Sequence, residues 1–151
     1  MRLTTFTDYS LRVLMFVAVK NGGRTTIDEI ARGYGISRNH LMKVVFRLGQ
    51  LGYLATVRGK GGGVTLAKPP EAINIGALVR QTEDDLAIVE CFQKGEARAG
   101  CAIQPACVLR NALGEAVRAF VAVLDSYTLA DLIGPRRRLA KLLELPQAKR
   151  A

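Results

Sequence analysis

Apolar residues recur every three or four positions in three consecutive segments of the N-terminal half, and this spacing places them on one face of a helix. The first of these segments, residues 8–20, predicts a helix that ends at Asn21-Gly22-Gly23, because glycine disfavours helical backbone. The apolar face expected for this helix consists of Leu11, Leu14, Met15 and Ala18.

The next two segments carry helix-start signals. Thr26 and Glu29 fit the Thr-x-x-Glu capping box, and Gly35 can adopt the left-handed conformation that closes a helix. Ser37 is expected to cap a third helix that runs toward Gly52. The expected inward residues are Ile27, Ile30, Ala31 and Tyr34 in the second helix, and Leu41, Val44, Val45 and Leu48 in the third.

Two short helices joined by a glycine-containing turn are typical of a helix-turn-helix, whose second helix enters the DNA major groove. Its outward residues are expected to be Ser37, Arg38, Asn39, His40, Lys43 and Arg47. Arginine and asparagine pair bidentately with guanine and adenine, and here they are adjacent at the start of the helix. His40 is the one histidine, which argues against most acid–base enzymes, and we interpret it as a DNA-contacting or surface residue.

Residues 53–57 and 64–67 read as two strands joined by Arg58-Gly59-Lys60-Gly61-Gly62-Gly63, which predicts a β-hairpin wing. Glycine lets the backbone approach DNA closely, and Arg58 and Lys60 can neutralise phosphates, so we expect Arg58, Gly59, Lys60 and Gly61 to contact DNA. A nucleotide-phosphate loop is the alternative, but the pattern is not a P-loop and a strand follows it instead of a helix.

The net charge of +9 is concentrated in this half of the chain. Residues 1–70 contain 11 lysine and arginine residues against 3 acidic ones, whereas residues 71–151 contain 11 against 10. A basic half joined to a nearly neutral half indicates a polyanion-binding module with a second function attached.

The C-terminal half predicts a helix over residues 73–82, a cysteine-containing loop and a longer helix that starts after Cys107. The longer helix carries a heptad-like apolar stripe, which fits either a core helix or, in the context of a helix-turn-helix, a dimerisation helix. The stripe consists of Leu109, Leu113, Ala116, Phe120, Val123 and Tyr127. Thr128 is expected to cap a short helix through Asp131.

These elements divide the chain into four parts. Residues 1–68 form the expected winged helix-turn-helix, residues 69–107 a linker helix with the cysteine loop, and residues 108–134 the dimerisation helix with a short following helix. Residues 135–151 are expected to be a polar tail that is either disordered or in contact with phosphates. The fold class is therefore mainly α with a small β-hairpin.

Cys91, Cys101 and Cys107 are the only cysteines, with spacings of C-x9-C and C-x5-C. The sequence shows no signal peptide and no membrane span, so we expect a cytoplasmic protein in which thiols are reduced. Clustered cysteines there favour metal binding or redox sensing. The spacing matches neither zinc fingers, nor Cys-x-x-Cys, nor ferredoxins, so unliganded thiols remain an alternative.

The whole pattern resembles the iron–sulfur winged-helix repressor family, and within it the nitric-oxide-sensing branch. The resemblance rests on MRLTTFTDYSLRVLM, YGISRNHLMKVVFRLGQLGYLATVRGKGGG, the three-cysteine loop and LDSYTLADLI. Another branch has a histidine three positions after the third cysteine, where this chain has Arg110. The spacing between the first two cysteines is also longer than is usual in the family.

The resemblance implies a homodimer that binds a palindromic operator while it carries a cluster and releases it when nitric oxide nitrosylates the cluster. The cluster is expected to be 4Fe-4S, with 2Fe-2S possible, and its implied ligands are Cys91, Cys101, Cys107 and the partner subunit's Asp8. Without the resemblance, Asp8 is explained by the favourable effect of a carboxylate in the first turn of a helix.

Two other functions are left open by the residues themselves. The chain could bind DNA and sense redox or iron status through a different cluster, zinc or thiol oxidation. An enzyme is the least supported class, because neither a nucleophile–base pair nor a nucleotide-binding motif is present.

Overall fold

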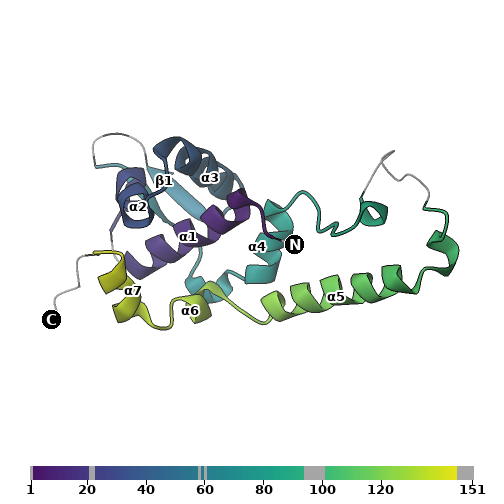
Figure 1. The fold of residues 1–151 in the computed structure, drawn as a ribbon. Coiled ribbons are helices and arrows are strands. Elements are labelled where there is room, and N and C mark those ends of the chain that lie inside the picture. Colours follow the sequence, from purple (N-terminus) through teal and green to yellow (C-terminus); the bar gives the residue numbers. More distant parts are fainter. Residues whose placement is uncertain (1, 21–22, 58, 60, 94–100, 146–151) are drawn as a thin grey trace.

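The computed structural model describes residues 2–20, 23–57, 59, 61–93 and 101–145, and it is mainly helical with one β-hairpin. Figure 1 shows two regions. Helices α1 to α4, the hairpin, α6 and α7 form a packed body, and the long helix α5 with the cysteine segment extends from its side. The expected fold class, mainly α with a small hairpin, is confirmed.

Helix α1 (Thr5–Lys20) lies at the centre of the body. It starts three residues before the expected position, because the Thr4 Oγ1 accepts a hydrogen bond from the Thr7 N–H at 3.2 Å and closes the first turn. Its buried residues are Thr7, Ser10, Val13, Leu14, Phe16, Val17, Ala18 and Val19. The expected stop at Asn21-Gly22 lies outside the described residues.

Helices α2 (Ile27–Tyr34) and α3 (Arg38–Gln50) begin and end as their local signals predict. The Glu29 N–H donates to Thr26 Oγ1 at 3.2 Å and the Thr26 N–H donates to Glu29 Oε2 at 2.7 Å, so the capping box is complete. Gly35 has a φ of 65°, which only glycine adopts at little cost. The inward residues Leu41, Val44, Val45 and Leu48 of α3 are all buried.

Strands β1 (Leu54–Val57) and β2 (Gly63–Leu66) pair antiparallel, with Leu54 opposite Leu66 and Val57 opposite Gly63. An isolated bridge between Thr25 and Val64 joins the hairpin to the segment before α2. Gly63 permits this approach, because a Cβ there would lie 2.8 Å from the Thr25 carbonyl oxygen.

A short 3-10 turn, η1 (Pro70–Ala72), leads to α4 (Ile75–Thr82). This helix begins two residues later than expected, because the Asn74 side chain accepts a hydrogen bond from the Ala77 N–H at 2.8 Å and caps it. The α5 helix (Val108–Asp125) is tied to α4 by Arg80, which donates to both carboxylate oxygens of Asp125 at 3.0 and 2.7 Å.

The C-terminal segment differs from the expected tail. After α6 (Leu129–Leu132), which Thr128 caps as predicted, residues Arg136–Leu142 form α7. The Arg136 guanidinium donates to the carbonyl oxygens of Ala18 at 2.8 Å and Val19 at 3.2 Å. A cationic donor there satisfies carbonyls that the C-terminus of α1 leaves without helical partners, so Arg136 acts as a cap on α1.

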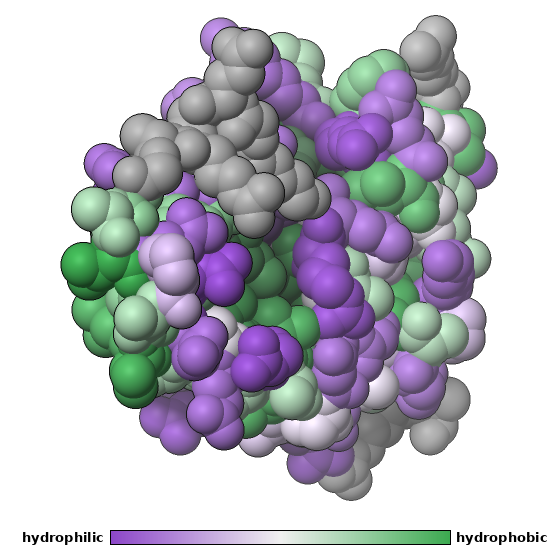
Figure 2. Space-filling model, turned by 90° about the vertical axis from the view of Figure 1, so that its right-hand side faces the viewer, coloured by the Kyte–Doolittle hydropathy of each residue, from purple (hydrophilic) through white to green (hydrophobic). Residues whose placement is uncertain are grey.

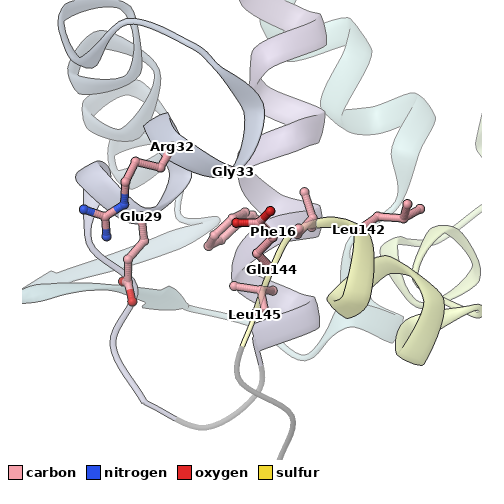
Figure 3. Close-up of a pocket in the computed structure, with 8 residues that line it drawn as sticks. Phe16, Glu29, Arg32, Gly33, Leu142, Glu144 and Leu145 are labelled. Carbon is pink, nitrogen blue, oxygen red and sulfur yellow. The ribbon is translucent and has the colours of Figure 1, made fainter.

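The end of this segment also covers α1. Leu145 is buried, and a cavity of about 400 Å³ separates Leu142–Leu145 from Phe16 and α2. Figure 3 shows Phe16 between the α2 residues Glu29 and Arg32 and the C-terminal residues. The Glu29 carboxylate is already bound by Lys20 Nζ at 2.7 Å, so this cavity belongs to the packing of α7 against the body.

Candidate nucleic-acid interface and cysteine segment

The recognition face of α3 is exposed along its length. All six side chains expected there point away from the core and are solvent-exposed: Ser37, Arg38, Asn39, His40, Lys43 and Arg47. Ser37 also caps the helix, since its Oγ accepts a hydrogen bond from the His40 N–H at 3.3 Å. The structure therefore places this predicted set on one accessible surface.

Arg38 has a partner that the sequence did not suggest. Its Nε lies 3.0 Å from Oδ1 of Asp28 on α2, and both side chains are at least half exposed. An exposed ion pair of this kind contributes little to stability. Its effect is on geometry, because a carboxylate on Nε leaves the two terminal amino groups for a second bidentate partner.

The wing is anchored by another unpredicted residue. The Arg24 Nη1 donates to the Gly61 carbonyl oxygen at 2.8 Å and connects the hairpin turn to the start of α2. Gly59 and Gly61 have φ values of 96° and 77°, as a tight glycine turn requires. Arg58 and Lys60 lie outside the described residues, so their contacts with DNA remain a prediction.

The recognition helix also meets α1 near its start. The His40 and Tyr9 rings are tilted by 42° with centroids 6.2 Å apart. Tyr9 directly follows Asp8, whose carboxylate oxygens accept hydrogen bonds from Arg12 Nε at 3.0 Å and Nη2 at 2.9 Å. The hydrogen bond that Arg12 donates to Asp8 raises the pKa of the Arg12 guanidinium above its usual value. The first turns of α1 thus link Asp8 to the recognition helix.

The cysteine segment lies along the start of α5. Cys91 is in the 3-10 turn η2 (Glu90–Phe92), and Cys107 follows the 3-10 turn η3 (Gln104–Ala106) as the N-cap of α5. The Cys107 Sγ accepts a hydrogen bond from the Arg110 N–H at 3.3 Å. The Cys107 Sγ therefore lies at a helix N-terminus, where the first backbone N–H groups lack helical acceptors.

Phe92 brings the two ends of the cysteine segment together. The Arg110 guanidinium lies 5.9 Å from the centre of the Phe92 ring, and a Cβ on Gly114 would be 3.7 Å from the same ring. Cys91 precedes Phe92, and Cys107 lies one turn before Arg110, so both thiols belong to the same end of α5. Cys101 is exposed between them in sequence.

The N-terminus borders a further hollow. Both the Thr4 N–H and its Oγ1 donate to Glu83 Oε1, at 2.8 and 3.0 Å. A cavity of about 640 Å³ lies between residues 2–4, residues 83–88 and Phe120 of α5. Figure 2 views the molecule from the end where the cysteine segment lies and shows hydrophobic side chains in a central hollow with hydrophilic side chains along its rims.

Comparison with known proteins explains this combination of a wing, a long helix and a cysteine segment. Residues 3–135 match the Rrf2 family, which is described as an iron-dependent transcriptional regulator. The chain belongs to the Rrf2 family. An HTH-type transcriptional regulator named NsrR from Bacillus subtilis is 53% identical over 97% of this chain and all of its own length. The NsrR regulator of Geobacillus kaustophilus is 50% identical over 95% of the chain and 97% of its own.

Solved Rrf2 structures share the fold. The global cysteine regulator CymR of B. subtilis superposes with a TM-score of 0.71 at 30% identity, covering 89% of this chain and 98% of its own. IscR of T. potens gives a TM-score of 0.70 at 25% identity and covers 98% of this chain and 94% of its own. The resemblance seen in the sequence is therefore confirmed at the level of the family and of the relatives' names.

The donor atoms of this Rrf2 chain suit iron–sulfur chemistry, because thiolates are the typical ligands of such clusters. Arg110 Nε is buried without a hydrogen-bond partner among the described residues, so the site has a donor for which an acceptor is still to be supplied. Within the described residues, however, no three histidine, cysteine or acidic side chains gather closely enough to hold a metal ion. Asp8 is in the first turn of α1, which Figure 1 shows beside α4, whereas Cys107 caps the N-terminal end of α5, which lies away from α1. A single chain therefore does not bring the four predicted ligands together.

Across the described parts of the chain, none of the helices has the length and apolar character needed to cross a bilayer.

Proposed function

We propose that this Rrf2 regulator is a nitric-oxide-responsive repressor that binds a palindromic operator as a homodimer. It binds the operator while it carries an iron–sulfur cluster and releases it when the cluster is nitrosylated. The observation that carries the proposal is the position of Cys91 and Cys107 beside the start of α5, a helix of which no residue is buried in the single chain. The resemblance to the nitric-oxide-sensing branch supplies the signal.

The dimer follows from the exposure of α5. None of its 18 residues, all of which the structure describes, is buried. The stripe residues Leu109 and Val123 are 65% and 59% exposed, and Tyr127 just beyond the helix is 46% exposed. Apolar surface is stabilised by about 25 cal/mol for each Å² removed from water. A second copy of α5 offers the same stripe, and two-fold pairing covers both at once.

Operator binding uses α3 and the wing. Arg38 and Asn39 stand at the N-terminal end of the recognition helix, where side chains reach base edges. Lys43, Arg47 and the wing cations supply phosphate contacts, which position the protein without reading sequence. The two-fold axis of the dimer then sets the separation of the two half-sites.

The cluster would be held by Cys91, Cys101 and Cys107 of one chain and Asp8 of the partner subunit. When bound, it supplies iron that reacts with nitric oxide, and a carboxylate is a harder and weaker partner for that iron than a thiolate. In the single chain, both carboxylate oxygens of Asp8 are bound by Arg12. Ligation of iron by Asp8 therefore requires Arg12 to release at least one of these oxygens.

The chain's own contacts carry the signal to DNA. Asp8 and Tyr9 are adjacent in the first turns of α1, and the Tyr9 ring lies against His40 of α3. Fixing Asp8 at the partner's cysteines orients α1, and α1 orients the recognition helix. Release of Asp8 would change the spacing of the two recognition helices, so that they no longer match both half-sites.

A second candidate keeps DNA binding but uses thiol oxidation as the trigger. The observation that favours it is the Cys107 Sγ at the N-terminus of α5, together with the exposure of Cys101. Solvent-accessible thiols are the ones most readily oxidised, so Cys101 is the group expected to react first.

Two measurements separate the candidates. The protein is first purified anaerobically and analysed for iron and sulfide, and it is then titrated with nitric oxide while operator binding is measured. The repressor proposal expects brown protein whose operator complex dissociates as nitric oxide is added. Cys91→Ala should lose the cluster, whereas Asp8→Ala should keep part of it and respond abnormally. Equal cluster loss and equal DNA binding in both variants would contradict ligation across the dimer.

A further inference from the structure

Two large apolar side chains stand on the outside of the recognition helix. Phe46 is 64% exposed and Met42 is 46% exposed, whereas the other long apolar side chains of α3, Leu41 and Leu48, are fully buried. Isolated exposed apolar residues are common, but an adjacent pair on a functional surface indicates a contact that forms only with a partner. The earlier DNA-contact set did not include either residue.

The helical geometry places Phe46 near the centre of the exposed face and Met42 beside it. At about 100° per residue, Phe46 projects about 150° away from the middle of the face formed by the four buried residues of α3. Met42 precedes Phe46 by four positions and Asn39 precedes it by seven, so the three lie in one line along the helix. That line is flanked by Lys43 on the same exposed side.

The charges around the pair decide which partner fits. Every charged side chain of α3 is basic, since Arg38, Lys43 and Arg47 have no acidic neighbour within the helix. A second copy placed on this face would bring like charges together, whereas a polyanion would neutralise them. The occupant therefore combines negative charge with small apolar groups at its surface.

We propose that Phe46 and Met42 contact thymine 5-methyl groups in the major groove and so determine part of the operator sequence. The proposal rests on the proposed function, in which α3 enters the operator. The thymine methyl is the apolar group on the major-groove edges of the four base pairs, and apolar side chains recognise it. Asn39 lies in the same line and offers an amide suited to adenine, so the line pairs hydrogen-bond and methyl recognition.

The test compares thymine with deoxyuridine, which lacks the methyl group and keeps its base pairing. A duplex is first selected by the anaerobically prepared wild-type protein from a pool with a random centre. Each thymine of that duplex is then replaced by deoxyuridine, and dissociation constants are measured by fluorescence anisotropy. For the wild-type protein, we expect about a fourfold loss of affinity at one or two thymines per half-site, which corresponds to one methyl group removed from a buried contact.

Phe46→Ala should bind the thymine duplex more weakly than the wild-type protein does. Replacing the contacted thymine with deoxyuridine should then cause no further loss of affinity in this variant. Met42→Ala should behave in this way at a neighbouring thymine. Leu142→Ala is the matched control, because Leu142 is 70% exposed but lies on α7. Circular dichroism melting confirms that each variant is folded.

The outcomes are distinct. If Phe46→Ala and the wild-type protein lose the same factor at every deoxyuridine, or if the variant loses affinity uniformly for all duplexes, the methyl contact is excluded. If Phe46→Ala changes the oligomeric state measured by light scattering and leaves the deoxyuridine effect intact, the face contacts protein instead. If the wild-type protein selects no duplex at all, the proposed operator binding itself fails.

Discussion

Helices α1 and α5 are similar in length, at 16 and 18 residues, but they differ in how far the single chain buries them. Eight residues of α1 are buried, because α3, α4, α6 and α7 pack around it. None of the α5 residues is buried, although α5 also carries an apolar stripe. The comparison indicates that the stability of α1 is intramolecular, whereas that of α5, in the proposed dimer, depends on a second molecule.

The strongest way to test this comparison is to remove a side chain from the core around α1. Phe16 is 1% exposed, and Phe16→Ala should lower the free energy of unfolding by about 3–5 kcal/mol, because it leaves a cavity in a packed core. Urea unfolding at constant protein concentration measures the change. Phe120→Ala on α5 is the matched control, and an equal loss in both variants when dimerisation is blocked would remove the distinction.

A charge on the α5 stripe should separate the subunits. Val123→Asp places two carboxylates in the proposed two-fold interface, and desolvating them should raise the dimer dissociation constant by about 100-fold or more. Sedimentation equilibrium measures this constant, and Leu142→Asp at an exposed position of α7 provides the control. A dimer of unchanged affinity would show that α5 is not the interface.

Removal of the cap on α1 should have a smaller effect. Arg136→Ala loses two hydrogen bonds to the carbonyls of Ala18 and Val19, which should cost about 1–2 kcal/mol. Thermal unfolding of this variant is compared with that of Arg137→Ala. The Arg137 side chain is exposed, so its removal should change the free energy of unfolding by less than about 0.5 kcal/mol. Similar melting temperatures in both would show that α7 does not hold α1.

The smallest expected effect is the pH dependence of the link between α4 and α5. The hydrogen bond from Arg80 lowers the pKa of Asp125 below its usual value. A lowered folded-state pKa stabilises the protein above the unfolded pKa, and the contribution is lost as the pH falls through the folded pKa. The stability difference between the wild-type protein and Asp125→Asn should therefore shrink in acid. Chemical denaturation at neutral and acidic pH checks it, and a constant difference would contradict it.

The contrast also explains which features the sequence could predict. The caps at Thr26, Ser37 and Thr128 and the buried face of α3 depend on residues within a few positions of one another, and they were confirmed. The start of α4 at Ile75 differs from the expected residue 73, because the Asn74 side chain caps the helix inside the apolar stretch.

Long-range pairings could not be read in this way. The ion pair between Arg38 and Asp28 and the hydrogen bond from Arg24 to Gly61 depend on how separate elements approach each other. The run Arg136-Arg137-Arg138 predicts a polar tail when it is considered alone. The role of Arg136 depends on a long-range contact, because its guanidinium donates to carbonyl oxygens at the end of α1. The cysteine ligands and the dimer remain predictions, since both require atoms from a second chain.

The contact between Arg136 and α1 has a consequence for biosynthesis. Its two partners are separated by 117 and 118 positions, so the nascent DNA-reading region leaves the ribosome well before the residue that secures its central helix. Residues 1–68 by themselves would expose the side of α1 that Leu145 and α7 cover. The groove-reading surface is therefore fully supported only after residue 136 has been synthesised, and a chain terminated before that residue should compete poorly for promoter sites.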